Sequence, residues 1–214
     1  MSEQVFINAL QQFLPENTTI PVSNLLAQYN VHLKISRPRA TKLGDYRAPH
    51  GNRGHRISIN NDLNPFAFLI TLVHEIAHLT TWLKKGNKVK PHGQLWQNEF
   101  KTLLTPFINQ RVFPNDILMA LLKHLHNPAA SSCRDANLMK VLKKYDPQKG
   151  TIFLEDLQLN EHFMLYNGGH KRSKQVFKKG LKQRTRYKCE EVFSGKYYLI
   201  NKLAEVILID NNHC

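Results

Sequence analysis

Cysteine is scarce in this sequence, and the three cysteines present lie far apart. Cys133, Cys189 and Cys214 are odd in number, and none belongs to a C-x-x-C pair. A disulfide framework needs several paired cysteines and an oxidising compartment, and an all-cysteine zinc site needs four thiolates. The sequence therefore argues against a disulfide-rich secreted scaffold and predicts no second zinc held by cysteines.

We expect no secretion signal, and the sequence has no run of about eighteen or more uninterrupted apolar residues. Its first residues, MSEQVFINALQQFLPEN, have no basic start, no long apolar core and no small-residue cleavage site. We therefore predict a cytoplasmic protein without a membrane span.

Acidic residues are few. The 16 Asp and Glu stand against 30 Lys and Arg, so the formal net charge is +14 and the pI is near 9.8. The excess gathers in residues 171–188, where Phe177 and Tyr187 are interleaved with basic residues, as in surfaces that follow a phosphate backbone and stack bases. The predicted nucleic-acid-binding residues are Lys171, Arg172, Lys174, Lys178, Lys179, Lys182, Arg184, Arg186 and Lys188. The alternatives are a solvated basic face or a patch for an acidic protein or RNA.

Residues 64–86, NPFAFLITLVHEIAHLTTWLKKG, predict one long buried helix. Asn64 is a favourable N-cap, Pro65 suits the first helical position, and Gly86 suits the C-terminal end. The segment between them is apolar on almost every side, which indicates a helix inside the core.

Into this apolar helix are set His74, Glu75 and His78, the pattern H-E-x-x-H. Residues four apart share a helix face, so both imidazoles can reach one ion. Glu75 lies about 100° further round the helix, where it can reach a water on that ion. This is the division of roles in a zinc hydrolase: two histidine ligands and one general base. The alternative is a chance match on a core helix.

A catalytic zinc has three protein ligands and an open position. His50, His55 and His92 are the nearby candidates for the third ligand. His92 is favoured because it precedes a second amphipathic pattern, and the dipole at a helix N-terminus favours the neutral imidazole that a metal needs. The alternative for His92 is an exposed histidine at the helix end.

The motifs HEIAHLTTW and HGQLWQNEF, with TKLGDYR and HRISINNDLNP upstream, resemble the SprT-like metalloprotease domain of bacterial SprT proteins and eukaryotic Spartan. The resemblance covers roughly residues 5 to 126 and is far more specific than H-E-x-x-H alone. It implies one zinc ion on His74, His78 and His92, with Glu75 as general base. It also implies a zinc peptidase, in some members acting on DNA-bound or DNA-crosslinked proteins and activated by DNA.

Three short segments predict strands of a small antiparallel sheet that leads into the H-E-x-x-H helix: residues 31–36, 42–47 and 55–60. Together with the helices they predict an α+β, zincin-like metalloprotease core. Tyr46 and Arg47 are predicted to touch substrate, since an edge strand beside such a cleft can pair with an extended peptide. The alternative for both is an ordinary sheet-surface role.

The C-terminal part changes character. Short β-like segments punctuated by glycine follow residue 151 and predict a small sheet or barrel. We predict three parts: a SprT-like zincin domain at 1–128, a linker with a short helix at 129–150, and a basic β-rich domain at 151–214.

The sequence thus favours a zinc-dependent metalloendopeptidase that acts on protein substrates, with a basic C-terminal domain that contacts nucleic acid. DNA, as opposed to RNA, is implied only by the resemblance. The alternatives are a zinc hydrolase unrelated to DNA and a non-enzymatic nucleic-acid-binding protein braced by zinc.

Overall fold

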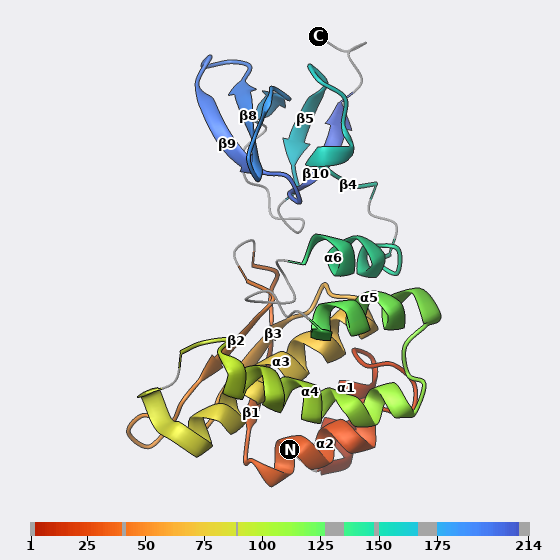
Figure 1. The fold of residues 1–214 in the computed structure, drawn as a ribbon, viewed down its shortest axis with the longest axis vertical. Coiled ribbons are helices and arrows are strands. Elements are labelled where there is room, and N and C mark those ends of the chain that lie inside the picture. Colours follow the sequence, from red (N-terminus) through yellow and green to blue (C-terminus); the bar gives the residue numbers. More distant parts are fainter. Residues whose placement is uncertain are drawn as a thin grey trace. The chain divides into compact units, whose positions relative to one another are not determined.

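The structure is a computed structural model that describes residues 3–39, 42–88, 90–126, 135–147, 150–166 and 175–209. The chain forms two compact units, Met1–Asp146 and Pro147–Cys214. Helices and strands are mixed along the chain (Figure 1), which confirms the predicted α+β class. Cys133, Cys214, Lys171, Arg172 and Lys174 lie outside the described residues.

The first unit contains helices and a small sheet. Its elements are α1 (Glu3–Gln11), α2 (Thr19–Gln28), β1 (His32–Ser36), β2 (Gly44–Arg47), β3 (Arg56–Asn60), α3 (Pro65–Lys85), the 3-10 turn η1 (Gly86–Lys88), α4 (Gln94–Asn109), α5 (Asn115–His126) and α6 (Ala136–Lys143).

The sheet of the first unit is mixed, so the prediction of an antiparallel sheet is wrong. Its strand order is β1-β3-β2, with β1 parallel and β2 antiparallel to β3. The first strand, β1, lies at one edge of the sheet, β2 lies at the other edge, and β3 lies between them. Strand β3 runs antiparallel to β2 and parallel to β1. Leu33 and Ile35 pair with Ile57 and Ile59, and these apolar residues share the inner face.

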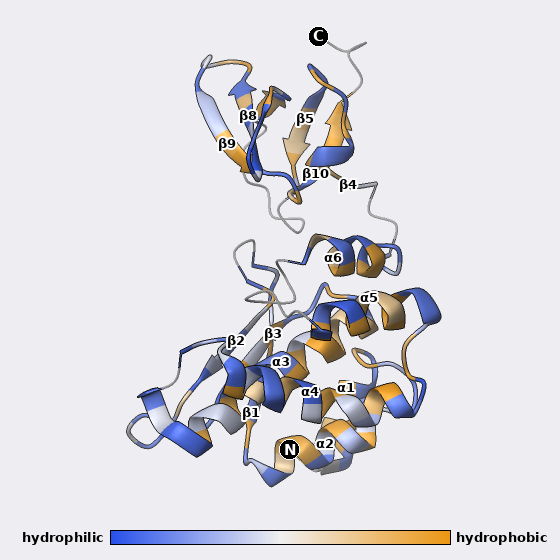
Figure 2. Ribbon diagram, viewed as in Figure 1, coloured by the Kyte–Doolittle hydropathy of each residue, from blue (hydrophilic) through white to orange (hydrophobic). Residues whose placement is uncertain are grey.

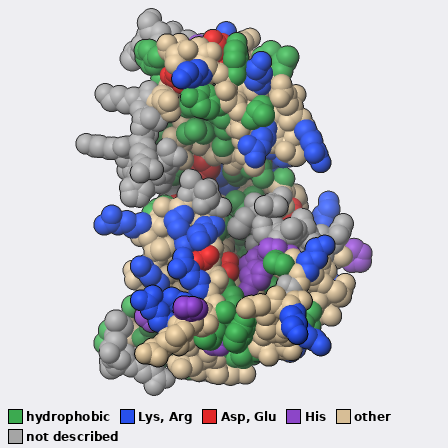
Figure 3. Space-filling view, turned by 90° about the vertical axis from the view of Figure 1, so that its left-hand side faces the viewer, with side chains coloured by type: hydrophobic (Ala, Val, Ile, Leu, Met, Phe, Trp, Pro, Cys, Tyr) green, Lys and Arg blue, Asp and Glu red, His purple; other side chains and the backbone are tan. Residues whose placement is uncertain are grey.

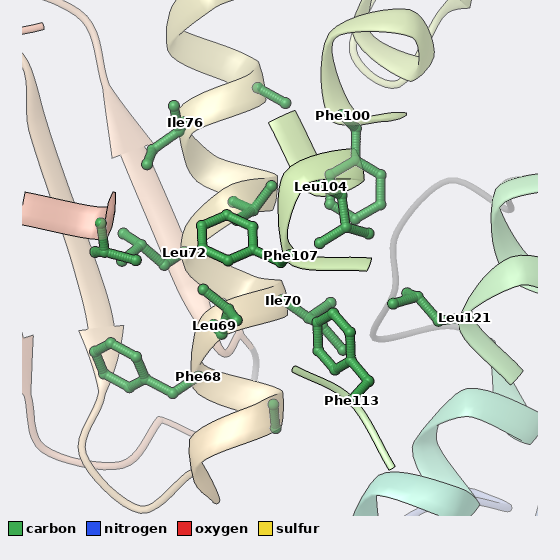
Figure 4. Packing of buried hydrophobic residues seen from close by; sticks show 14 of the residues in the cluster. Phe68, Leu69, Ile70, Leu72, Ile76, Phe100, Leu104, Phe107, Phe113 and Leu121 are labelled. Atoms are coloured by element: carbon green, nitrogen blue, oxygen red, sulfur yellow. The ribbon is translucent and has the colours of Figure 1, made fainter. Parts of the chain in front are cut away.

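Helix α3 is the centre of the core, as its sequence predicts. The Asn64 side chain accepts a hydrogen bond from the backbone N–H of Ala67, Pro65 opens the helix, and Gly86 ends it at φ +60°. Fourteen of its 21 residues are buried. Figure 4 shows apolar side chains of α3, such as Ile70 and Leu72, gathered with Phe107 of α4 into one core.

Helices α5 and α6 complete this unit, and each has an apolar and a polar side (Figure 2). The short helix predicted inside the linker is α6, and its Leu138 and Leu142 are buried in the same core as α3. Asn64 also donates hydrogen bonds to the Leu142 carbonyl (2.9 Å) and to Asp146 Oδ1 (2.7 Å). The end of α6 is therefore attached to the start of α3.

The second unit is an antiparallel sheet with its own core. Its elements are β4 (Ile152–Phe153), the turn η3 (Leu154–Asp156), β5 (His162–Leu165), β6 (Val176–Lys178), β7 (Lys182–Gln183), β8 (Arg186–Glu191), β9 (Tyr197–Asn201) and β10 (Glu205–Ile209). The order is β4-β10-β5-β6-β8-β7, and β9 pairs with β8. Phe163 stacks on Phe177, and Cys189 is fully buried beside them in the core.

Within the described residues, one helical stretch, Pro65–Lys88, is long and apolar enough to cross a membrane by length and composition. However, 78% of its most apolar window is buried inside the protein. It is the central core helix of the first unit, which is compatible with the predicted absence of a membrane span. The cytoplasmic location stays a prediction.

Candidate metal centre

Three histidines converge on one point in the first unit. His74 and His78 lie one turn apart on α3, and His92 lies two residues before α4, which packs against α3. Their Nε2 atoms form a nearly equilateral triangle with sides of 3.1, 3.2 and 3.2 Å. Among the described residues, these three form the one group of His, Cys, Asp or Glu with metal-site spacing.

This triangle fits a tetrahedral zinc. Zinc–nitrogen bonds of about 2.0–2.1 Å place the nitrogens of a tetrahedral site about 3.3 Å apart. Burial and the neighbouring histidines lower the pKa of His74 to about 2, and burial and His92 lower that of His78 to about 4. Both rings are therefore neutral at pH 7, and their nitrogen lone pairs are available to bind a cation placed between them. One metal ion can be held here.

His92 reaches the site through an unusual backbone conformation. Its φ is +59°, in the left-handed region that costs a non-glycine residue about 1–2 kcal/mol. Its carbonyl accepts a hydrogen bond from the Gln97 side chain at 3.2 Å, which ties it to the first turn of α4. Such backbone strain is kept only where the surrounding contacts fix the residue in place. Here the strained backbone directs the His92 side chain toward the two histidines of α3.

Trp96 forms an aromatic support for all three histidines. It is fully buried, and its ring centroid lies 4.6, 5.4 and 4.7 Å from those of His74, His78 and His92. Phe100, one turn later, stacks on Trp96 at 5.1 Å. The sequence marks both residues only as part of an apolar helix face, but their contacts hold the imidazoles in place.

Glu75 lies against β2. Burial, together with the negative charge of Asp45, raises the pKa of Glu75 to about 8, although a hydrogen bond from the Tyr46 backbone opposes this rise. Gly44 leaves the space for the carboxylate. An ideal Cβ on Gly44 would stand 2.6 Å from Glu75 Oε1 and 2.8 Å from Thr71 Cγ2. A glycine inside a predicted strand is a signal of such close approach, and our sequence reasoning did not use it.

A pocket of about 230 Å³ opens beside His78. Tyr46, Trp82 and Trp96 supply aromatic walls. The Tyr46 hydroxyl shares a 3.0 Å hydrogen bond with His55 Nδ1, and burial raises the Tyr46 pKa to about 12, so this hydroxyl stays protonated at neutral pH. His55, one of the three candidates for the third ligand, thus pairs with Tyr46, and its ring lies edge-on to Trp82 at 5.3 Å.

The predicted substrate-binding pair is divided between two faces of β2. Tyr46 lines the pocket beside His78, whereas Arg47 lines a separate groove on the other side of the sheet. Successive residues of a strand point to opposite faces, so the two side chains cannot serve one pocket. Arg47 instead bonds to Asp45 at 2.9 Å.

The basic residues predicted to bind nucleic acid are only partly on the surface. Lys182, Arg184, Arg186 and Lys188 are exposed on or near β7 and β8, and Lys178 is half-buried. Lys179 has to be withdrawn from this set, because it is 4% exposed and donates to the carbonyls of Glu155 and Leu157. Two aromatic residues of the basic stretch are not free to stack bases: Phe177 is a core residue, and Tyr187 is half-buried under the Lys179 ammonium.

Zinc should stabilise the metal-free protein. We expect one ion per chain and a rise of about 2.7 kcal/mol in the free energy of unfolding at a free zinc concentration one hundred times the Kd. Thermal unfolding and metal analysis after dialysis measure both effects. His78→Ala should lose the ion and the stabilisation, while His126→Ala, which removes an exposed histidine of α5, should keep both. Stoichiometric zinc in the His78→Ala protein would contradict this assignment.

Acid should destabilise the metal-free protein through the same histidines. The folded pKa values of about 2 (His74) and 4 (His78) lie below the unfolded value of about 6.5, so between pH 6.5 and 4 the unfolded chain binds more protons. The free energy of unfolding then falls with falling pH, by at most about 1.4 kcal/mol per unit and histidine. Above pH 6.5 the effect vanishes. The free energy of unfolding is measured with urea at pH 7 and at pH 5. It should change less between these two pH values for His78→Asn than for the natural chain, and an equal change in both proteins would contradict the prediction.

A comparison with protein families matches residues 5–112 to the SprT-like family. The matched segment is just over half of the 214 residues and contains the three histidines, Glu75, Gly44 and Trp96. Neither the curated proteins nor the solved structures give a significant match.

Proposed function

Because this chain belongs to the SprT-like family, we propose that it is a zinc-dependent metalloendopeptidase with a zincin-like core. The observation that carries the proposal is the convergence of three histidine Nε2 atoms, next to a buried glutamate and beside a pocket. His74, His78 and His92 would hold the ion. When bound, zinc supplies Lewis acidity and lowers the pKa of water.

Glu75 and Tyr46 are proposed to carry out the other steps of the reaction. Glu75 takes the proton from the attacking water and returns it to the leaving amine. In the metal-free protein burial raises the pKa of Glu75, and the positive charge of a bound ion would lower it again, so that the carboxylate can serve as the base. Tyr46 lines the pocket beside His78, and its protonated hydroxyl can donate to a substrate carbonyl when His55 Nδ1–H is the donor in the bond between the two side chains.

The test is proteolysis of fluorescein-labelled casein by zinc-loaded protein. Cleavage should stop after chelation and return on addition of one equivalent of zinc. Bound zinc without cleavage of casein or of basic DNA-binding proteins would favour the non-enzymatic alternative, in which the ion only braces the fold.

We further propose that the second unit brings the enzyme to nucleic acid, so that proteins bound there become substrates by proximity. The support is one face of the β8–β9 pair, where Arg186 is opposite Asn201 and Lys188 is opposite Leu199. The Lys188 ammonium lies 4.2 Å from the centroid of the Tyr197 ring, which is 59% exposed. Exposed aromatic rings among cations are typical of single-strand binding.

The same proteolysis assay tests this second proposal. Single-stranded DNA should accelerate cleavage of a DNA-binding substrate, and Lys188→Gln/Tyr197→Ala should reduce the acceleration. Cleavage at the same rate with and without DNA would leave the peptidase proposal standing and would favour a zinc hydrolase unrelated to DNA.

A further inference from the structure

The outer face of the β1-β3-β2 sheet carries a regular array of polar side chains. The alternation that points Leu33, Ile57 and Tyr46 inward points their neighbours outward. The strand register places these outward residues in rows across the three strands. One row is His32, Arg56 and Arg47, and the next is Lys34, Ser58 and Asp45.

This array is unbalanced in charge. Arg47 and Arg56 are direct cross-strand partners, and like charges in that position destabilise a sheet. The one carboxylate in the array, Asp45, is already shared by Lys42 at 2.8 Å and Arg47 at 2.9 Å. Within the described residues, Arg56 Nε is buried and has no hydrogen-bond partner. The described part of this face therefore carries more cationic donors than its one carboxylate can accept.

Arg39 adds a fixed cation to the same face. Its Nε donates to Asn60 Oδ1 at 2.8 Å, and its Nη1 donates to Ser58 Oγ at 3.0 Å. These bonds hold the guanidinium against the sheet before any ligand arrives. A preorganised arginine loses less conformational freedom on binding than a mobile one.

These side chains line a groove of about 420 Å³. Its lining residues are His32, Lys34, Ser36, Arg39, Asp45, Arg47, Arg56, Ile57 and Ser58. Four of them are Lys or Arg, one is acidic, and none is Phe, Tyr or Trp. Figure 3 shows Lys and Arg side chains gathered on this side of the first unit.

We propose that this groove binds the phosphate groups of a single-stranded nucleic acid without reading its bases. Arginine, lysine and serine donors are the groups that contact phosphate oxygens, and Arg matches phosphate geometry with two parallel bonds. No Phe, Tyr or Trp lines the groove, so the usual platforms for stacking single-stranded bases are missing there, and the net charge of +14 favours a polyanion. The site lies on the peptidase unit, is separate from the β8–β9 face, and does not depend on the proposed catalysis.

The test is binding of fluorescein-labelled dT20 to the full chain, measured by fluorescence anisotropy over a series of NaCl concentrations. Each phosphate contact contributes about 0.7 to the slope of log K against log salt for single strands. Lys34→Gln/Arg56→Gln should therefore lower the slope by about 1.4 and weaken binding at every salt concentration. Lys34→Gln alone, a change at an exposed position, should lower it by about 0.7.

The matched control is Arg111→Gln/Lys123→Gln, which removes two exposed cations from the same unit outside the groove. Its slope should equal that of the natural chain. An equal loss in both double variants would mean diffuse charge attraction and would overturn the proposal, as would unchanged binding in the groove variant. Poly-glutamate is added as a competitor at the same total charge as dT20. If it displaces dT20 from the natural chain but not from the groove variant, the proposal is overturned and the groove is assigned to acidic protein segments.

Discussion

Replacing Glu75 with Gln should abolish peptide hydrolysis and leave zinc bound. Glutamine keeps the size and shape of the side chain but cannot take a proton from water at neutral pH. General base catalysis contributes typically about 10² to 10⁴ in rate, so kcat/KM should fall by at least two orders of magnitude. Because the proposed metal ligands are all histidines, the zinc content should stay at one ion per chain.

The matched control for this change is Glu99→Gln. Glu99 lies on α4 and pairs with Lys84, so the same substitution is made away from the Glu75 carboxylate. Steady-state cleavage of a quenched peptide and metal analysis are measured on all three proteins. A Glu75→Gln protein with zinc bound and with the kcat/KM of the natural chain would refute the catalytic role of this glutamate.

Gly44→Ala should also cost activity, because the new methyl group meets the carboxylate of Glu75, the proposed general base. The added Cβ would stand 2.6 Å from Glu75 Oε1, closer than side-chain contacts in folded proteins allow. Either β2 moves outward or the carboxylate turns away. A displacement of about 1 Å can cost about 10²-fold in rate, and overpacking costs about 1–3 kcal/mol of stability.

Gly54→Ala is the control for Gly44→Ala. Gly54 lies just before β3, and the nearest atom to an added Cβ there is 4.0 Å away, so this change should be nearly neutral. The measurements are kcat/KM, zinc content and urea unfolding. A folded Gly44→Ala protein that cleaves peptide as fast as the Gly54→Ala protein would show that the space at Gly44 does not position Glu75.

The sequence predicts α3 well because its information is local. The cap at Asn64, the apolar run and the glycine at 86 each act within a few residues of one another. The histidine pair follows from helix periodicity alone. The third histidine does not, because local spacing left His50, His55 and His92 open. Its place depends on how the chain returns from η1 to α4, and the family resemblance supplied that information.

The sheet shows the opposite case. Alternation of apolar residues indicates which face of a strand is buried, but it contains no information on strand order or direction. For that reason the parallel pairing of β1 with β3 was missed. The same alternation would have separated Tyr46 from Arg47, had it been applied to β2.

The inward position of Lys179 could not be predicted from composition. A run of lysines predicts a solvated surface, because burying a cation is costly unless it is hydrogen-bonded. Here the two carbonyl acceptors come from residues 155 and 157, more than twenty positions earlier in the chain. Only the folded sheet brings them to the ammonium.

The hydrogen bonds from the Asn64 amide to Leu142 and Asp146 have a consequence for producing the first unit by itself. The family match ends at residue 112, but a fragment cut there would lack Phe113, α5 and α6, and would leave Ile70 without core residues such as Phe113 and Leu121. A fragment cut after α5 would still remove the two acceptors that hold the Asn64 amide at the start of the histidine-bearing helix. The shortest soluble fragment that keeps zinc should therefore extend through Asp146.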